Sequence, residues 1–430
     1  MNNTFVKEKL QSGVTLIAEP LPNFHSVTVG IWVGAGSITE TPGENGISHL
    51  IEHMLFKGTK KRTAKQIAVD VDNIGGQINA FTSKECTCYY IKVIDEKLDA
   101  GLEILTDLFC NATLDPAELE KEKGVVLEEI AMSNDNPEDA AMDLISSAYF
   151  DGCSLAKTII GPPENIKRFT RDDLVSYMDR YYTASNIVVA VAGNFEAQKL
   201  KESLNRYLVD INKHPLALPE FSHCGGFVTH GGFEINQRDI EQVHLCMGMP
   251  CYNLQDDKRF ALNILNNVVG GSMSSRLFQK IREEMGMAYS VFTYPALYRD
   301  TGMYGVYAGT MAGNTEKVAE MVLEELKRVK ADGITQDEFQ QSKEQLKGSM
   351  ILSLESTSSK MSAIGKALLL TGKTYSDEEV LRMIENVSYE EIREVAEYCL
   401  DFTGLTVTGV GKVKDTESLK NIVAQNRRPV

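Results

Sequence analysis

The sequence predicts an α+β protein made of two homologous α/β-sandwich domains, each with a largely antiparallel sheet and helices on one face. An internal repeat is the first reason. Residues 171–195 and 389–413 both read as an amphipathic helix, a short turn and a buried strand, and matched positions such as Ile187 and Leu405 lie 218 residues apart. Residues 115–129 and 335–349 match at an offset of 220. Two nearly equal offsets indicate a duplicated unit of ~210–220 residues. The second reason is that strands and helices interleave in each half without a dinucleotide-binding glycine fingerprint.

The elements follow from the residue patterns. Alternating segments at 26–34 and 88–93 predict strands, and residues 97–112 predict an amphipathic helix. The apolar run 187–192 predicts a core strand and is far shorter than the ~20 residues that cross a bilayer. Residues 214–232 contain two prolines and four glycines and predict a linker. The predicted domains are therefore residues 1–213 and 233–430.

Composition limits the partners and the compartment. The 430 residues carry 60 acidic and 44 basic side chains, a net charge of −16. Such a chain is poorly suited to nucleic acid or to an anionic membrane, and a cationic substrate fits better. The N-terminus lacks the apolar segment of a secretory signal. The eight cysteines are scattered with no C-x-x-C pair, so we expect reduced thiols in a cytoplasmic protein.

A metal motif lies early in the chain, at His49-Leu50-Ile51-Glu52-His53. On a helix, His49 and His53 share one face one turn apart and can bind a single Zn²⁺. Glu52 lies beside that face and can take a proton from a water molecule at the metal. A catalytic zinc needs a third protein ligand and an open position. The run 119–130 offers Glu122, Glu128 and Glu129, among which the pattern alone does not choose; Val125, Val126 and Ile130 are expected to form its apolar side.

These motifs identify a family. HLIEH, the later EKGVVLEEI, and the segments GISHLIEHMLFKGT (46–59), GGQINAFTSKECTCYY (75–90) and SSRLFQKIREEMGMAYSV (274–291) together resemble the insulinase/pitrilysin family of zinc metallopeptidases, closest to its processing-peptidase branch. The resemblance covers almost the whole chain and implies a duplicated α+β metallohydrolase of the processing-peptidase type. It places the third zinc ligand on Glu129, one zinc per chain, and a supporting acid on Glu122. The positions in the second half that match Glu122 and Glu129 are Ser342 and Ser349, so that half should bind no zinc.

The resemblance also implies how a peptide is held. Asn79 and Ala80 match an exposed edge that receives an extended substrate as an added strand. Arg282 and Tyr289 match a pair that grips the substrate backbone, where the Tyr hydroxyl can stabilise the oxyanion. Because one chain carries both the zinc motif and this pair, it could work as a homodimer, although a heterodimer with a homologous subunit stays open.

Three further residues bear on specificity. Phe56, one turn after His53, is either a core aromatic or, by the resemblance, part of the pocket for the residue after the cut bond. Asp139 and Asp143 follow Asn136-Pro137, a plausible helix start, and are four residues apart. They are either surface charges or, by the resemblance, the acids that bind a basic residue two positions before the cut. The alternatives are a general oligopeptide-degrading peptidase and a non-catalytic binding subunit of the same fold.

Overall fold

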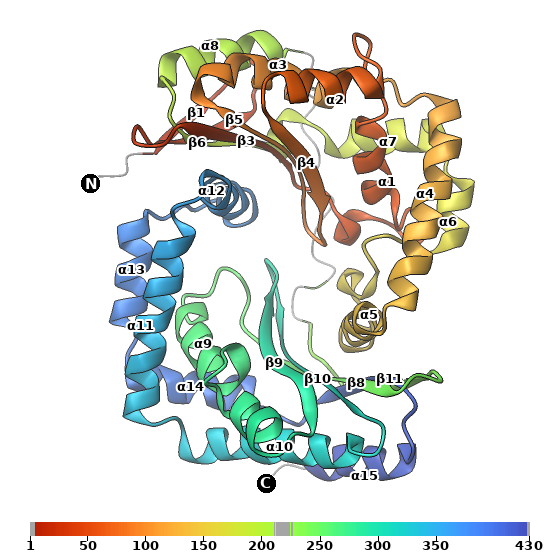
Figure 1. Cartoon of the computed structure of the whole chain (residues 1–430), viewed down its shortest axis with the longest axis vertical. Coiled ribbons are helices and arrows are strands. Elements are labelled where there is room, and N and C mark those ends of the chain that lie inside the picture. The colour runs from red at the N-terminus through yellow and green to blue at the C-terminus, as the bar shows by residue number, and fades with distance from the viewer. Residues whose placement is uncertain (1–4, 210, 212–223, 225–226, 428–430) are drawn as a thin grey trace. The chain divides into compact units, whose positions relative to one another are not determined.

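The computed structural model describes residues 5–209, 211, 224 and 227–427, and they form two compact units (Figure 1). The first unit comprises the described residues of 1–130, 157–221 and 351–377. The second comprises those of 131–156, 222–350 and 378–430. The units depart from the predicted halves at two segments, because 131–156 belongs to the second unit and 351–377 to the first. Most of the predicted linker, 214–223 with 225 and 226, lies outside the described residues.

The first unit is built on a six-stranded sheet. Its strands, in spatial order, are β1 (Val6–Lys9), β2 (Thr15–Pro20), β6 (Ile187–Gly193), β3 (Ser26–Val33), β5 (Thr87–Ile94) and β4 (Gln77–Thr82). Only β2 and β6 pair in parallel; the other neighbours are antiparallel. Strand β4 forms an edge of this sheet.

One face of the sheet carries the main helical layer. Its helices are α1 (Ile47–Leu55), α2 (Ala64–Asn73), α3 (Leu98–Asn111), α4 (Pro116–Asp135), α6 (Pro163–Arg168), α7 (Arg171–Tyr181) and α8 (Ala197–Tyr207). Side chains of a strand point alternately to the two faces of its sheet. On β3, Val27, Val29 and Ile31 point to the same face and are fully buried against apolar side chains of these helices. Helix α4 contributes Val126 and Ile130 to this core, whereas Val125, expected on the apolar side, is 51% exposed.

The opposite face of the same sheet is covered by a helix from the C-terminal half of the sequence, α12 (Thr357–Thr371) (Figure 1). Trp32 of β3 is buried there and donates a hydrogen bond from Nε1 to Met361 Sδ, at 3.3 Å. A buried ion pair between Lys360 Nζ and Glu19 Oε1, at 2.8 Å, joins the helix to β2. These contacts explain why residues 351–377 belong to the first unit.

The second unit repeats the design with five strands. In spatial order they are β7 (Phe233–Gln237), β11 (Thr406–Gly411), β8 (Gln242–Pro250), β10 (Gly302–Met311) and β9 (Ala288–Leu297). The pair β7–β11 is parallel and the rest are antiparallel, as for the matching strands of the first sheet. The remaining helices are α5 (Pro137–Tyr149), α9 (Arg259–Asn266), α10 (Thr315–Asp332), α11 (Gln336–Ser353), α13 (Asp377–Asn386), α14 (Tyr389–Cys399) and α15 (Thr416–Asn426), with π-helical turns at Asn267–Gly271 and Phe278–Glu284.

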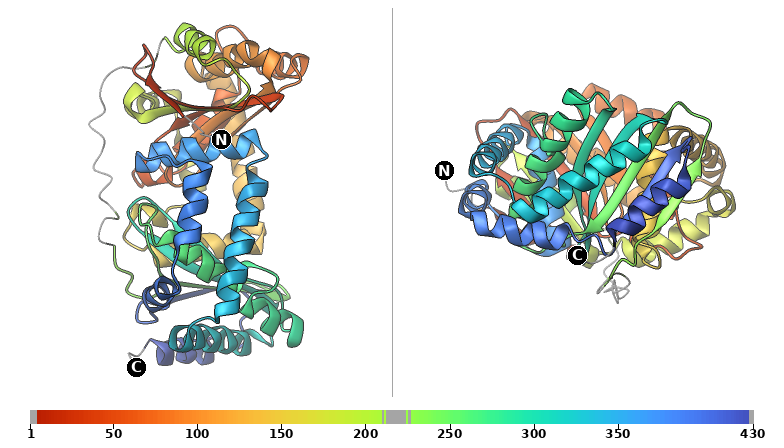
Figure 2. Two further views of the ribbon diagram at one scale, coloured as in Figure 1. Left: turned by 90° about the vertical axis from the view of Figure 1, so that its left-hand side faces the viewer. Right: turned by 90° about the horizontal axis from the view of Figure 1, so that it is seen from below.

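Helix positions confirm the duplication. Helices α4 and α11 begin at residues 116 and 336, which is the predicted offset of 220. Helices α10 and α15 lie side by side on one face of the second sheet (Figure 2, right), and α5 packs against β8 and β11. The α+β class with two homologous units is therefore confirmed, with one addition: the face opposite the main layer also carries a helix, α12 in the first unit and α5 in the second.

The N-terminus of α11 is closed by a reciprocal cap. Thr335 Oγ1 accepts a hydrogen bond from the Glu338 backbone N–H, and Glu338 Oε2 accepts one from the Thr335 N–H. Arg276 also binds this carboxylate at 2.7 Å. Burial alone would raise the pKa of Glu338, but the hydrogen bonds from Arg276 and Thr335 outweigh it and hold the pKa below its usual value.

Three other expectations from the sequence concern the cysteines, membrane-spanning segments and the distribution of charge. Cys153 and Cys224, both in the second unit, form a disulfide, so the prediction of reduced thiols is wrong for this pair. The six other cysteines are not disulfide-bonded. No helix within the described ranges is long and apolar enough to cross a membrane.

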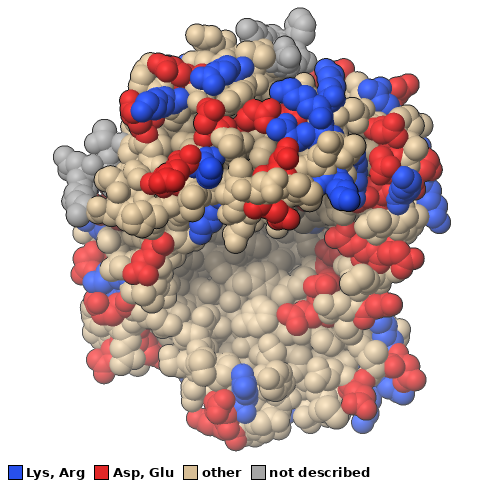
Figure 3. All heavy atoms as spheres, turned by 45° about the horizontal axis from the view of Figure 1, so that its top comes forward, with Lys and Arg blue, Asp and Glu red and all other residues tan. Residues whose placement is uncertain are grey.

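On the face shown in Figure 3, Lys and Arg are interspersed with Asp and Glu, so the acidic excess forms no continuous patch on that side.

Candidate metal centre and active site

Helix α1, which carries the HxxEH motif, is anchored at its N-terminus by a buried carboxylate. Glu40 is 3% exposed and accepts hydrogen bonds from the backbone N–H groups of Gly46 and Ser48, each at 2.9 Å, and from Asn45 Nδ2. Gly46 has φ of 100°, a conformation that favours glycine, and starts the helix at Ile47. Glu40 lies outside every motif and was not predicted from the sequence.

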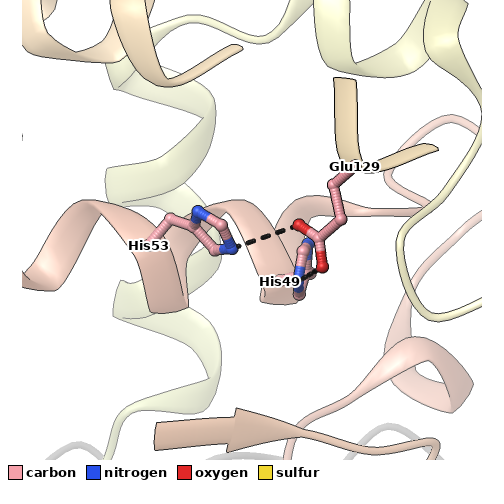
Figure 4. A group of neighbouring side chains, drawn as sticks. All are labelled: His49, His53 and Glu129. Carbon is pink, nitrogen blue, oxygen red and sulfur yellow. Dashed lines mark ion pairs between the residues drawn. The ribbon is translucent and has the colours of Figure 1, made fainter. Parts of the chain in front are cut away.

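Three side chains converge in the first unit. His49 and His53 lie one turn apart on α1, and Glu129 reaches them from α4 (Figure 4). Glu129 Oε1 lies 3.6 Å from His49 Nε2, and Glu129 Oε2 lies 3.5 Å from His53 Nε2. One donor atom from each residue falls within 4.8 Å of the others. Three such atoms around a common point can bind one metal ion.

The donor set fits zinc. Burial, and to a lesser degree the neighbouring His53, lowers the pKa of His49 to about 4. The imidazole is therefore neutral at neutral pH, the form that binds metal. Two histidines and one glutamate with an open position are typical of catalytic zinc. The structure places Glu129 in this group, whereas the neighbouring Glu128 is exposed, which separates two candidates that the pattern alone left equal.

Glu122 lies behind the metal-binding face. It is 4% exposed and links two side chains of the α1 region: its Oε1 is 2.8 Å from His53 Nδ1 and its Oε2 is 2.6 Å from Lys57 Nζ. A carboxylate on the outer nitrogen of a metal-binding histidine fixes the orientation and tautomer of the ring. Lys57 was not predicted, although its position one turn after His53 was a signal that could have found it.

Glu52 lies on α1, next to His53 in sequence. Burial raises its pKa, while a hydrogen bond from Thr82 Oγ1 and the nearby His53 act in the opposite direction. Thr82 donates to Glu52 Oε2 at 2.5 Å from strand β4. A raised pKa brings a carboxylate closer to the range where it can accept and return a proton near neutral pH.

The residues predicted to hold the peptide in the first unit lie on or next to the same elements. Asn79 and Ala80 are on β4, whose described partner is β5 alone. Asn79 is exposed, and its Oδ1 accepts a hydrogen bond from the Ala80 N–H at 2.8 Å. Phe56 ends α1 and is half-buried against the core of the first unit, which agrees with its reading as a core aromatic and leaves part of the ring open.

The second unit carries the other predicted residues. The Arg282 guanidinium carbon lies 4.9 Å from the centre of the Tyr289 ring, so the structure brings this pair together. Tyr289 is 77% exposed. Asp139 and Asp143 lie on α5, which starts at Pro137 with Asn136 as its cap, as the sequence predicted. Asp139 is exposed and Asp143 is half-buried.

The position in the second unit that matches Glu122 holds a neutral network instead. Ser342 is 3% exposed, donates to the carbonyl of Ile264 at 3.1 Å, and accepts from Asn267 Nδ2 at 3.0 Å. Ser349, which matches Glu129, is exposed. Hydroxyl groups therefore stand in the second unit at the positions that match the carboxylates of Glu122 and Glu129.

Comparison with known proteins gives a peptidase match in the first part of the chain and an inactive-domain match after it. Residues 15–163 match the family model described as insulinase (peptidase family M16), and residues 168–346 match that of the peptidase M16 inactive domain. An uncharacterized zinc protease of Bacillus subtilis is 44% identical, over 90% of this chain and 93% of its own length. Another, from Streptomyces coelicolor, is 36% identical over 98% of this chain and 93% of its own.

Solved structures share the fold. A protease from Helicobacter pylori superposes with a TM-score of 0.87 at 23% identity, covering 95% of this chain and 99% of that one. A structure described as a peptidase M16 inactive domain from Pseudomonas fluorescens gives 0.86 at 17% identity, covering 96% and 98%. At these identities the likeness concerns the fold.

Proposed function

Because this chain belongs to the insulinase family of peptidases, M16, we propose that it is a zinc-dependent metalloendopeptidase that hydrolyses extended peptides. One observation carries the proposal: His49, His53 and Glu129 converge in a zinc-compatible arrangement, and Glu52 lies on the same helix as the two histidines. A non-catalytic subunit would not need the general base in addition to the ligands. We propose one zinc per chain, since the only three-residue metal-binding group among the described residues is this one.

The residues of the proposed site have distinct roles in metal binding, proton transfer and ligand orientation. Zinc, when bound by His49, His53 and Glu129, would polarise the scissile carbonyl and make an attacking water more acidic. Glu52 accepts the proton of that water at its carboxylate and returns it to the nitrogen of the leaving amine. Glu122 holds the His53 ring in one orientation through Nδ1.

The substrate is held by its backbone. An extended peptide can add to the edge strand β4 beside Asn79 and Ala80, and main-chain hydrogen bonds then accept varied sequences. Arg282 and Tyr289 would grip the peptide backbone, with the Tyr289 hydroxyl available to a developing oxyanion. The support for this pair is their mutual contact and the exposure of the Tyr ring.

We further propose a processing-type preference and a dimer. Asp139 and Asp143 offer two carboxylates one turn apart on α5, suited to an Arg or Lys two residues before the cut, and Phe56 would favour an apolar residue just after it. The resemblance to the processing-peptidase branch supports a homodimer, or a heterodimer with a homologous subunit. A general oligopeptide-degrading role is the alternative to a processing one.

A peptide-library digest read by mass spectrometry tests the proposal. Wild-type protein should cut internal bonds and lose activity with a zinc chelator, whereas Glu52→Gln should retain zinc and cut at least ~100-fold more slowly. The double change Asp139→Asn with Asp143→Asn should weaken cleavage of basic peptides selectively. Equal loss on neutral peptides would refute the specificity assignment, and wild-type turnover by the Gln variant would refute the mechanism.

A further inference from the structure

Strand β4 is connected to the proposed general base by one side chain, Thr82. The strand alternates, so Ile78, Ala80 and Thr82 are half-buried while their neighbours Gln77, Asn79 and Phe81 are exposed. Ile78 and Ala80 pack against the core of the first unit, to which α1 also contributes. At the end of this row, the Thr82 hydroxyl donates a hydrogen bond to Glu52 Oε2 at 2.5 Å.

We propose that Thr82 is a positioning residue, which sets the orientation of the Glu52 carboxylate for proton transfer; this inference rests on the proposed peptidase function. The glutamate side chain has three rotatable bonds, and Glu52 is only partly buried, so packing alone does not define its carboxylate. A hydrogen bond to Oε2 leaves Oε1 as the oxygen that accepts the proton. Placement of this kind matters, because a misplacement of ~1 Å can cost ~100-fold in rate.

Thr82 also belongs to the strand that is proposed to bind the substrate. It is the last residue of β4, the edge strand beside which the substrate is proposed to add. The same strand therefore aligns the peptide, through its backbone, and the base, through the Thr82 side chain.

Substitution by isosteric and conservative residues tests the proposal. Thr82→Val keeps the shape but removes the hydroxyl, and it should lower kcat by about 10–100-fold while KM stays within about twofold. Thr82→Ser restores the donor and should recover most of kcat. Both variants should retain one zinc per chain and the circular dichroism spectrum of the wild type. Loss of zinc, loss of the native spectrum or wild-type kcat in Thr82→Val would overturn the inference, as would a Ser variant as slow as the Val variant.

A double-mutant cycle supplies a readout other than turnover. A peptide hydroxamate binds zinc and also hydrogen-bonds to a glutamate base, so its affinity reports the placement of that carboxylate. Thr82→Val should weaken the hydroxamate about tenfold in the wild-type background but less than about twofold in the Glu52→Gln background. An equal loss in both backgrounds would show that Thr82 does not act through Glu52. If wild-type protein cuts no peptide, the proposed function fails; if it cuts and Thr82→Val cuts equally well, only this inference fails.

Discussion

The docking of α12 on the first sheet makes the substitution Gly365→Ala a demanding test of the fold. A Cβ atom at Gly365 would lie 2.7 Å from Trp32 Cε2 and 2.8 Å from Ala190 Cβ, and it would also contact Trp32 Nε1. The preferred separation of carbon atoms is ~3.5–4.0 Å, so the methyl group would be too close by about 1 Å. The neighbours are a buried indole and a sheet residue, which have little room to move.

Gly124→Ala is the matched control. Gly124 lies inside α4, in the same unit, and an added Cβ meets no atom within 4 Å. Ala stabilises an exposed helix interior by ~0.5–1 kcal/mol relative to Gly, and both variants gain this term. Overpacking costs ~1–3 kcal/mol and applies to Gly365 alone. The free energy of unfolding should therefore be ~1–3 kcal/mol lower for Gly365→Ala than for Gly124→Ala.

Tryptophan fluorescence measures this difference directly. Trp32 is the only tryptophan of the chain and is 1% exposed at the α12 contact, so its emission follows the first unit during denaturant unfolding. The midpoint should fall for Gly365→Ala and rise slightly for Gly124→Ala. Equal midpoints, or a more stable Gly365 variant, would show that α12 does not pack on this sheet as described.

Three further outcomes are expected. Glu129→Gln should reduce bound zinc well below one per chain by metal analysis, whereas Glu128→Gln, whose side chain is exposed, should retain it; equal retention would refute the ligand assignment. Lys57→Met should weaken zinc binding by about tenfold in a chelator competition, because it leaves the buried carboxylate behind the metal site without its cation, while the exposed Lys65→Met should match the wild type. The pKa of Glu338 is depressed in the folded state, so its stabilisation is present above about pH 4.5 and is lost as the pH falls through the folded pKa. Urea unfolding followed by circular dichroism between pH 3 and 6 should therefore show a smaller pH dependence for Glu338→Gln, and an unchanged slope would contradict this assignment.

The repeat and the helix and strand types could be predicted because they depend on local periodicity. The offset of 220 between α4 and α11 was readable from matched residues. The exchange of α12 and α5 between the two halves of the sequence was not, because an amphipathic pattern shows that a helix has an apolar face but not which sheet it covers. Gly30 and Gly365 allow Trp32 and α12 to approach closely. The sequence alone does not show why these positions need glycine, because the two segments come together only in the folded chain.

Some residues of the candidate site could likewise be predicted from local spacing, and others could not. His49 and His53 are four residues apart on one helix, so their common face followed from helical geometry. Glu129 required the resemblance, since helical spacing could not separate it from Glu128. Glu122 followed from the resemblance, but Thr82 could not be predicted, because its partner Glu52 is 30 residues away in sequence. Such contacts depend on tertiary packing and leave no local pattern.

In the proposed mechanism, one zinc site and one carboxylate base in the first unit hydrolyse peptides. Zinc content and peptide turnover measured on the same preparation of Glu52→Gln, beside the wild type, test it most directly. We predict one zinc per chain in both proteins and turnover in the wild type alone. Wild-type turnover by the variant, or a wild-type protein that hydrolyses peptides without bound zinc, would contradict it.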